Sequence, residues 1–353
     1  MTFKKILESD SLFAIVILPR ILAQHKVVQK ISYFYFVFII GTAFGAFIVV
    51  VATNQWYQVF TRYVDLAGGF FIAQTSYMTM YIPIYIKMFW DIYEQMFPRL
   101  WPLDYITSNN KFTKISNLIK IGALIITVAV LVFATAALPW RGDEYYLYFP
   151  VKMAVDYFNI YLRNLYLFFF YTCFYHVGLT IISNLFCLTY LILHLYNQYC
   201  MLSEKLKTLS DYKQQDLVTQ ELILCIKLHQ TLLEYVTKLN NLMYYPIYCY
   251  SASGVITVLT IILYPKNSLV DVLESVFVTI ITICVAAGFC FLGQIIEDSS
   301  EEASNSAYST TWYKWNAKNR RLLLFFLQQT QRKAVLTSSG VITVNYQLLI
   351  RVS

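Results

Sequence analysis

Charged residues are scarce in this chain: Asp, Glu, Lys and Arg make up 13% of its 353 residues, whereas soluble domains contain about 25%. Hydrophobic residues make up 58% and aromatic residues 18%. The formal charge of +7 does not form a basic stripe, because the cations are scattered between apolar runs. The composition therefore indicates a membrane protein and gives no support for a nucleic-acid partner.

The motifs of common enzymes and metal sites are missing as well. The sequence contains no C-x-x-C, no Gly-rich phosphate loop and no Ser-His-Asp arrangement. His176 and His194 share a helix face, but five helical turns separate them by about 27 Å, so they cannot bind one metal ion. We expect no enzymatic activity, no metal and no cofactor.

Long runs without Asp, Glu, Lys or Arg predict the membrane-spanning helices, because a helix needs about 20 mostly apolar residues to cross a bilayer. Six such runs cover residues 33–52, 68–86, 121–138, 165–193, 242–264 and 275–296.

A seventh, less regular run covers residues 322–350, and Arg332 and Lys333 interrupt it. One continuous span would place both cations in lipid, at about 2.5–3.5 kcal/mol each. We therefore predict a buried helix outside the bilayer at Leu322–Gln331, followed by a short seventh span at Ala334–Ile350.

The distribution of cations predicts the orientation of this seven-helix arrangement. Only Arg62, Arg141, Lys152, Arg163, Lys266 and Arg351 lie on the side opposite the N-terminus, which leaves 21 of the 27 on the N-terminal side. The excess of cations on the cytoplasmic side of membrane proteins places the N-terminus in the cytoplasm and the C-terminus outside.

The expected fold is an all-α membrane protein with a cytoplasmic helical anchor. Its parts are a cytoplasmic N-terminal segment at 1–32, helices one to six with their loops at 33–296, anchor helices within these at 194–241, a cytoplasmic loop and anchor helix at 297–333, and a short last helix at 334–353.

The anchor is predicted from apolar residues that recur at helical spacing between spans four and five. His229 and Leu232 lie in this pattern, and Leu323, Leu324, Phe326 and Leu327 supply the last anchor helix.

The acidic run Glu297–Glu302 allows three interpretations: a solvated helix face, a cation-attracting vestibule, or a surface that pairs with the region of Arg320 and Arg321.

A ligand site is predicted on the outer halves of spans two, three, four and six, where aromatic and apolar residues gather with few charges. Such a lining suits a small, weakly polar ligand, although ordinary helix packing and aromatic belts produce the same composition. The candidate residues are Phe70, Phe71, Gln74, Tyr77, Met78, Phe133, Tyr166, Phe169, Phe170, Cys173, Phe277, Ile280 and Ile281.

The C-terminal third resembles the insect odorant receptor family. The similarity lies in an ordered series of positions: Ala307, Tyr308, Trp312, Tyr313, Arg320, Arg321, Lys333, Val335, Leu336, Thr337 and Gly340. A second similar pattern precedes span five, at His229, Leu232, Leu233, Lys238, Leu239 and Asn240.

The resemblance implies a subunit of a ligand-gated, non-selective cation channel that senses small volatile compounds. It implies a heterotetramer with a co-receptor subunit in the plasma membrane of a sensory neuron dendrite, held together by the cytoplasmic helices. It also implies that the last span lines the pore, where the candidate residues are Thr343, Tyr346, Gln347 and Ile350.

Two departures from the family pattern stand near the C-terminus. Ala334 occupies a position where the family usually has Pro, and the sequence stops before the segment that carries the family's outer gate. From this we expect the chain alone to give no ligand-gated current.

Two other classes of protein stay open, a G-protein-coupled seven-helix receptor and a secondary transporter. The first requires the opposite orientation, and the second requires interrupted helices in matching halves.

Overall fold

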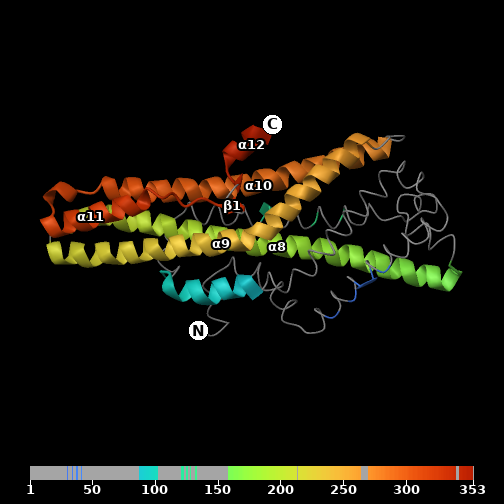
Figure 1. The fold of residues 1–353 in the computed structure, drawn as a ribbon, viewed down its shortest axis with the longest axis horizontal. Helices are drawn as coiled ribbons and strands as arrows, with labels where there is room; N and C mark the ends of the chain where they lie inside the picture. Colours follow the sequence, from blue (N-terminus) through green and yellow to red (C-terminus); the bar gives the residue numbers. More distant parts are fainter. Residues whose placement is uncertain are drawn as a thin grey trace.

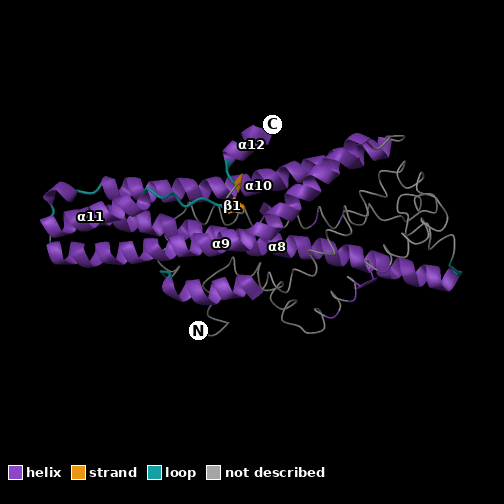
Figure 2. Ribbon diagram, in the orientation of Figure 1, coloured by secondary structure: helices purple, strands orange, loops and turns teal. Residues whose placement is uncertain are grey.

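The computed structural model shows long helices that run side by side (Figure 1). It describes residues 30, 34, 37–38, 41, 87–101, 121–122, 125, 128, 132, 158–212, 214–263, 269–338 and 342–352. Within these, helices predominate and two short strands stand near the C-terminus (Figure 2). The main elements are α8 (Ile160–Thr208), α9 (Gln215–Leu263), α10 (Leu269–Tyr308) and α11 (Ala317–Thr330).

Short elements connect and flank the long helices. Residues 87–96 are helical and continue into the 3-10 helix η1 (Phe97–Arg99). Two further 3-10 turns follow α8 and α10, namely η4 (Leu209–Asp211) and η5 (Trp312–Lys314). After α11 come β1 (Thr337–Ser338), β2 (Ile342–Thr343) and α12 (Tyr346–Val352).

Three of the helices are far longer than a bilayer requires. α8 and α9 each contain 49 residues and α10 contains 40, which corresponds to about 60–74 Å of helix against a hydrocarbon core of about 30 Å. α8 and α10 contain predicted spans four and six, and α9 contains nearly all of span five. Each helix continues past its predicted span, as expected for spans four and five, and the anchor role of these extensions stays a prediction.

One helical stretch among the described residues, Leu185–Asp211, is long and apolar enough to cross a membrane. It is mostly buried inside the bundle, and length and composition alone do not distinguish a span from a core helix. The residues described within predicted spans one and three are helical, while the rest of spans one, two and three lies outside the described residues.

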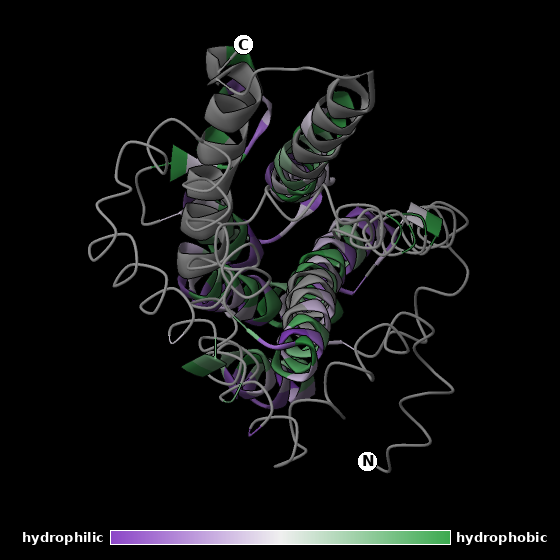
Figure 3. Cartoon of the chain, turned by 90° about the vertical axis from the view of Figure 1, so that its right-hand side faces the viewer, coloured by the Kyte–Doolittle hydropathy of each residue, from purple (hydrophilic) through white to green (hydrophobic). Residues whose placement is uncertain are grey.

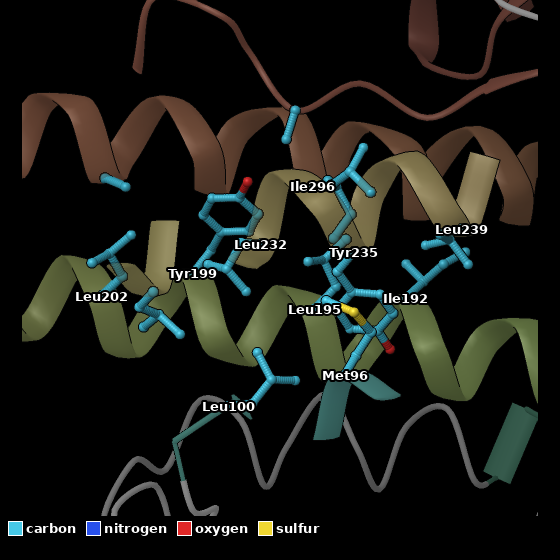
Figure 4. Close-up of a cluster of buried hydrophobic side chains, with 14 of the residues drawn as sticks. Met96, Leu100, Ile192, Leu195, Tyr199, Leu202, Leu232, Tyr235, Leu239 and Ile296 are labelled. Carbon is cyan, nitrogen blue, oxygen red and sulfur yellow. The ribbon is translucent and has the colours of Figure 1, made fainter. Parts of the chain in front are cut away.

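The best-packed region is a bundle of α8, α9, α10 and α11 near the end of the molecule that carries α11 (Figure 1). Its core contains Leu195, Tyr199, Leu232, Tyr235 and Ile296, which come from three helices and point toward one another (Figure 4). The Tyr235 hydroxyl donates a hydrogen bond of 3.1 Å to the carbonyl oxygen of Leu191, which satisfies a fully buried polar group.

At the opposite end the long helices separate. α9 ends and α10 begins near each other, away from the start of α8, as the view along the long axis also shows (Figure 3). The start of α8 is fixed by Asn159, whose Oδ1 accepts a hydrogen bond from the backbone N–H of Leu162. This N-cap satisfies one of the amides left free at a helix start.

A helix is present where the last anchor helix was predicted, but it begins earlier than the apolar pattern indicated. α11 starts at Ala317 because Asn316 caps it, with Oδ1 accepting from the backbone N–H of Asn319 at 2.8 Å. Thr219 donates to Oδ1 of Asn319 at 2.6 Å, and Nδ2 of Asn319 donates to the carbonyl oxygen of Gln215. These contacts attach the polar start of α11 to the start of α9.

The prediction of one helix over Ala334–Ile350 is wrong. Residues 334–336 are extended, β1 pairs antiparallel with β2 through Thr337↔Thr343 and Ser338↔Ile342, and helix begins only at Tyr346. The apolar count predicted a span, but the run is rich in β-branched residues on either side of a Ser-Gly sequence. β-branched residues favour strands, and Ser and Gly favour turns, so the hairpin is preferred.

Candidate functional site

Two of the predicted ligand-site residues lie in an aromatic cluster at the beginning of α8. The ring of Tyr166 lies 5.5 Å from that of Phe38, and the ring of Phe169 lies 5.4 Å from that of Phe34 and 5.8 Å from that of Phe38. These separations are typical of packed aromatic pairs. The structure therefore joins predicted spans one and four at this cluster.

Sequence analysis did not include span one in the ligand site. Phe34 and Phe38 stand four residues apart in an aromatic-rich stretch, so they share one helix face. That spacing is the signal that could have identified them. The helix that they face could not be inferred, because it depends on tertiary packing.

Most of the other ligand-site candidates cannot be placed. Ile280 is 54% exposed on α10, so it is not enclosed within the bundle. The side chains of Phe170, Cys173, Phe277 and Ile281, on α8 and α10, are outside the described part of the chain, and so are the whole residues Phe70, Phe71, Gln74, Tyr77, Met78 and Phe133.

The anchor candidates divide into two groups. Leu323 and Phe326 are 2% and 1% exposed and pack inside the subunit, whereas Leu324 is 59% exposed and Leu327 is half-buried. His229 and Leu232, on α9, belong to the buried group. α11 thus has one apolar face in the core of its own subunit and a second apolar face that the subunit leaves uncovered.

His229 is enclosed by aromatic rings. Its ring centroid lies 5.2 Å from that of Phe326 and 6.4 Å from that of Tyr199. Its Nε2 atom has no hydrogen-bond partner in the part of the chain that the structure describes. Burial disfavours the charged imidazolium and lowers the pKa of His229 to about 4. The side chain is therefore neutral at physiological pH.

We expect His229 to make the protein sensitive to acid. In the unfolded chain its pKa returns to 6.5, so between pH 6.5 and about 4 the unfolded state binds the proton and the folded state does not. Above that range His229 has no effect, and within it the free energy of unfolding falls by about 1.4 kcal/mol per pH unit. The melting temperature of the wild type should therefore fall as the pH is lowered through this range, and His229→Leu should remove the part of that fall that His229 causes. An unchanged pH dependence would show that the folded state also binds the proton.

The acidic run on α10 is a pairing surface, but not for the arginines proposed from sequence. Glu301 pairs with Lys333 at 2.7 Å, and Glu302 pairs with Lys207 of α8 at 3.0 Å. Oε2 of Glu297 accepts a hydrogen bond from Nδ2 of Asn345. These ion pairs are exposed, and exposed pairs stabilise weakly, so they mainly set which segments lie against α10.

The pore candidates lie at the C-terminal segment. Thr343 is on β2, and Tyr346, Gln347 and Ile350 are on α12, where their spacing places them on one face of the helix. All four are exposed in the single chain.

The C-terminal segment passes very close to α10. Val344 is buried, and a Cβ atom added to Gly293 would overlap the carbonyl oxygen of Val344. The backbone N–H of Val344 donates to the carbonyl oxygen of Leu336 at 2.9 Å, and this hydrogen bond helps to hold the backbone of Val344 against α10. Only glycine permits this approach, and sequence analysis did not identify the position.

Among the residues that the structure describes, no three His, Cys, Asp or Glu side chains are placed to hold a metal ion. The arrangement offers apolar and aromatic contacts, neutral hydrogen bonds and helix packing. These suit ligand binding and assembly.

Comparison with known sequences gives a match to the family model described as 7tm Odorant receptor, over residues 102–353. Odorant receptor 22b of Drosophila melanogaster is 25% identical over 153 residues, and Odorant receptor 22a of the same species is 25% identical over 158 residues. Each match covers 42% of this chain and 38% of the relative, so the chain matches well under half the length of these relatives.

Comparison with solved structures gives the insect olfactory receptor OR5 from Machilis hrabei, with a TM-score of 0.67 over 93% of this chain and 86% of that chain. The same receptor in complex with eugenol gives a TM-score of 0.70 over 96% and 93% of the two chains. Sequence identity is 10% in both cases, so these matches show a shared fold alone.

Proposed function

Because the matching family model covers more than half of its residues, the chain belongs to the 7tm odorant receptor family, and we propose that it is an odorant-sensing subunit of a ligand-gated, non-selective cation channel. It spans the plasma membrane seven times with its N-terminus in the cytoplasm. It assembles as a tetramer with a co-receptor subunit, and a small volatile ligand opens the channel.

The observation that carries the assembly part of this proposal is the second apolar face of the anchor. The bundle already has a closed core, yet Leu324 and Phe325 on α11, and Leu217 and Leu224 on α9, stay exposed. Uncovered apolar side chains at this density favour contact with another protein. Other subunits of the same channel are the partners that the family provides.

The ligand part rests on the aromatic cluster at the start of α8. Aromatic rings that pack against one another suit a compact, weakly polar compound held by dispersion and burial. Eugenol, bound by the Machilis hrabei receptor, is a small aromatic compound of this kind. We therefore include it in the first panel of ligands for this chain.

We expect Phe169→Ala to raise the half-maximal ligand concentration about tenfold or more. Phe169 is half-buried in the cluster. Losing its apolar contact with a ligand costs about 1.5–3 kcal/mol, and every 1.4 kcal/mol of lost binding is a factor of ten in affinity. The matched control is Phe168→Ala, because Phe168 is the neighbouring residue but is exposed. Dose–response curves from cells with equal surface expression make the comparison, and identical curves for both variants would remove Phe169 from the site.

Expression with and without a co-receptor tests the function as a whole. Cells that lack G-protein signalling are challenged with a panel of volatiles while whole-cell current is recorded. The proposal expects inward current that requires both subunits and a ligand. A response that depends on G proteins, or uptake of ligand without current, would contradict it.

A further inference from the structure

The extended residues that connect α11 to α12 lack the internal hydrogen bonds of a helix, so their backbone groups need partners elsewhere. The N–H of Ala334 donates to Oγ of Ser300 on α10 at 3.1 Å. The carbonyl oxygen of Leu336 accepts from Val344 in the returning segment at 2.9 Å. The carbonyl oxygen of Val335 and the N–H of Thr337 lie on the opposite side of the segment, which faces α9.

One side chain of α9, that of Asn240, forms hydrogen bonds with both groups. Nδ2 of Asn240, on α9, donates to the carbonyl oxygen of Val335 at 3.1 Å, and Oδ1 of Asn240 accepts from the N–H of Thr337 at 3.0 Å. A carboxamide carries a donor and an acceptor side by side, as a peptide group does. Asn240 therefore gives the segment the pair of hydrogen bonds that a neighbouring strand would supply.

The segment is also attached to α10 by an ion pair and hydrogen bonds. Lys333 pairs with Glu301, Asn345 donates to Glu297, and the N–H of Tyr346 donates to Oε1 of Gln294 at 3.4 Å. Asn240 thus supplies two side-chain hydrogen bonds from α9, while α10 holds the segment on both sides of the hairpin. Any shift of α9 relative to α10 must stretch the Asn240 contacts or carry the segment along.

α9 also reaches the opposite end of the molecule, where it ends near the start of α10 (Figure 1). α9 is one continuous helix that bends midway, where Pro246 lies (Figure 1). α8, which carries the aromatic cluster, packs against α9. Packed helices therefore connect the cluster with the residues that precede α12. Coupling between distant sites needs such a continuous physical connection.

We propose that Asn240 is a positioning residue for channel gating: its carboxamide fixes the extended segment at Val335–Thr337 to α9, so that movement of α9 on ligand binding shifts α12. This inference rests on the proposed function, because it needs a ligand-gated pore to act on. Asn240 lies on α9, outside the aromatic cluster and outside α12, so it acts through the segment that it holds.

The test uses the full chain co-expressed with a co-receptor and compares Asn240→Ala with Asn241→Ala. Asn241 is the matched control because it is the adjacent residue with the same side chain but is exposed on α9. Asn240→Asp is a third variant, which keeps the acceptor for Thr337 and loses the donor for Val335. Hydrogen exchange of the peptide covering 333–338 reports the attachment, and whole-cell current reports gating.

With surface expression and tetramer content unchanged, Asn240→Ala is expected to speed exchange of this peptide about tenfold, as the loss of two neutral hydrogen bonds implies. It should also shift the half-maximal ligand concentration or the ligand-free current about fivefold or more, the lower range of coupling between linked sites. Asn240→Asp should fall between Asn240→Ala and the wild type, and Asn241→Ala should match the wild type in both measurements.

Faster exchange with unchanged gating would overturn the proposal, because Asn240 would then be a structural attachment alone. Unchanged exchange in Asn240→Ala would overturn it as well. If the wild type itself gives no ligand-gated current, the proposed function fails. The exchange measurement then still shows whether the attachment exists, so the two failures are distinguishable.

Discussion

Leu324→Asp is expected to prevent tetramer assembly while the subunit still folds. Leu324 is 59% exposed in the single chain, so an aspartate there stays hydrated in the monomer. In an assembled anchor the same carboxylate must lose its water, at a cost of several kcal/mol per ion. Native gels of detergent-solubilised protein should show monomers in place of tetramers, with the helical circular dichroism unchanged.

The matched comparison is Leu323→Asp, one residue away on the buried face. Leu323 is 2% exposed within its own subunit, so a charge there is desolvated whether or not subunits assemble. The cost is a large fraction of a typical folding stability of about 5–15 kcal/mol. We expect loss of folded protein, not folded monomers. Intact tetramers in the Leu324→Asp variant would contradict the assembly role of this face.

The sequence could predict the existence of the anchor helix but not its two faces. Leu322 to Leu327 are all apolar, so the run contains no polar residues to mark which side faces water. The start of the helix was missed for a related reason: α11 begins with polar residues whose role is capping and attachment to α9. Hydrophobic periodicity does not detect such residues.

The aromatic cluster at the start of α8 was predictable in part. Tyr166 and Phe169 follow from the aromatic density of predicted span four, and the structure places them together. Their contact with Phe34 and Phe38 joins segments more than a hundred residues apart in the sequence, and no local pattern encodes that contact. The same holds for Asn240 and Val335, whose pairing appears only when the chain has folded.

The last segment shows where an apolar count misleads. Residues 334–350 contain enough apolar side chains to suggest a span, but strand preference depends on which apolar residues are present. Val335, Thr337, Ile342, Thr343 and Val344 are β-branched, and in the structure they lie in the extended and paired residues. Composition by residue type, not total hydropathy, was the better guide here.

Gly293→Ala is expected to abolish or strongly reduce ligand-gated current by displacing the C-terminal segment from α10. The added Cβ would overlap the carbonyl oxygen of Val344, and a backbone atom cannot move aside as a flexible side chain can. Overpacking a close contact costs about 1–3 kcal/mol, which the segment can avoid only by leaving the helix. Recordings from co-expressed subunits, at equal surface expression, measure the effect.

Gly288→Ala is the matched control, because Gly288 lies in the same helix and a Cβ there meets nothing within 4 Å. Replacing a helical Gly with Ala normally stabilises by about 0.5–1 kcal/mol, since the unfolded chain loses conformational freedom. Gly288→Ala should therefore raise the melting temperature or leave it unchanged, with normal current. Gly293→Ala brings the same gain in helix propensity as Gly288→Ala. If Gly293→Ala alone lowers the melting temperature or abolishes the current, the cause must be the contact with Val344. Normal current and stability in both variants would show that the segment does not need this close approach.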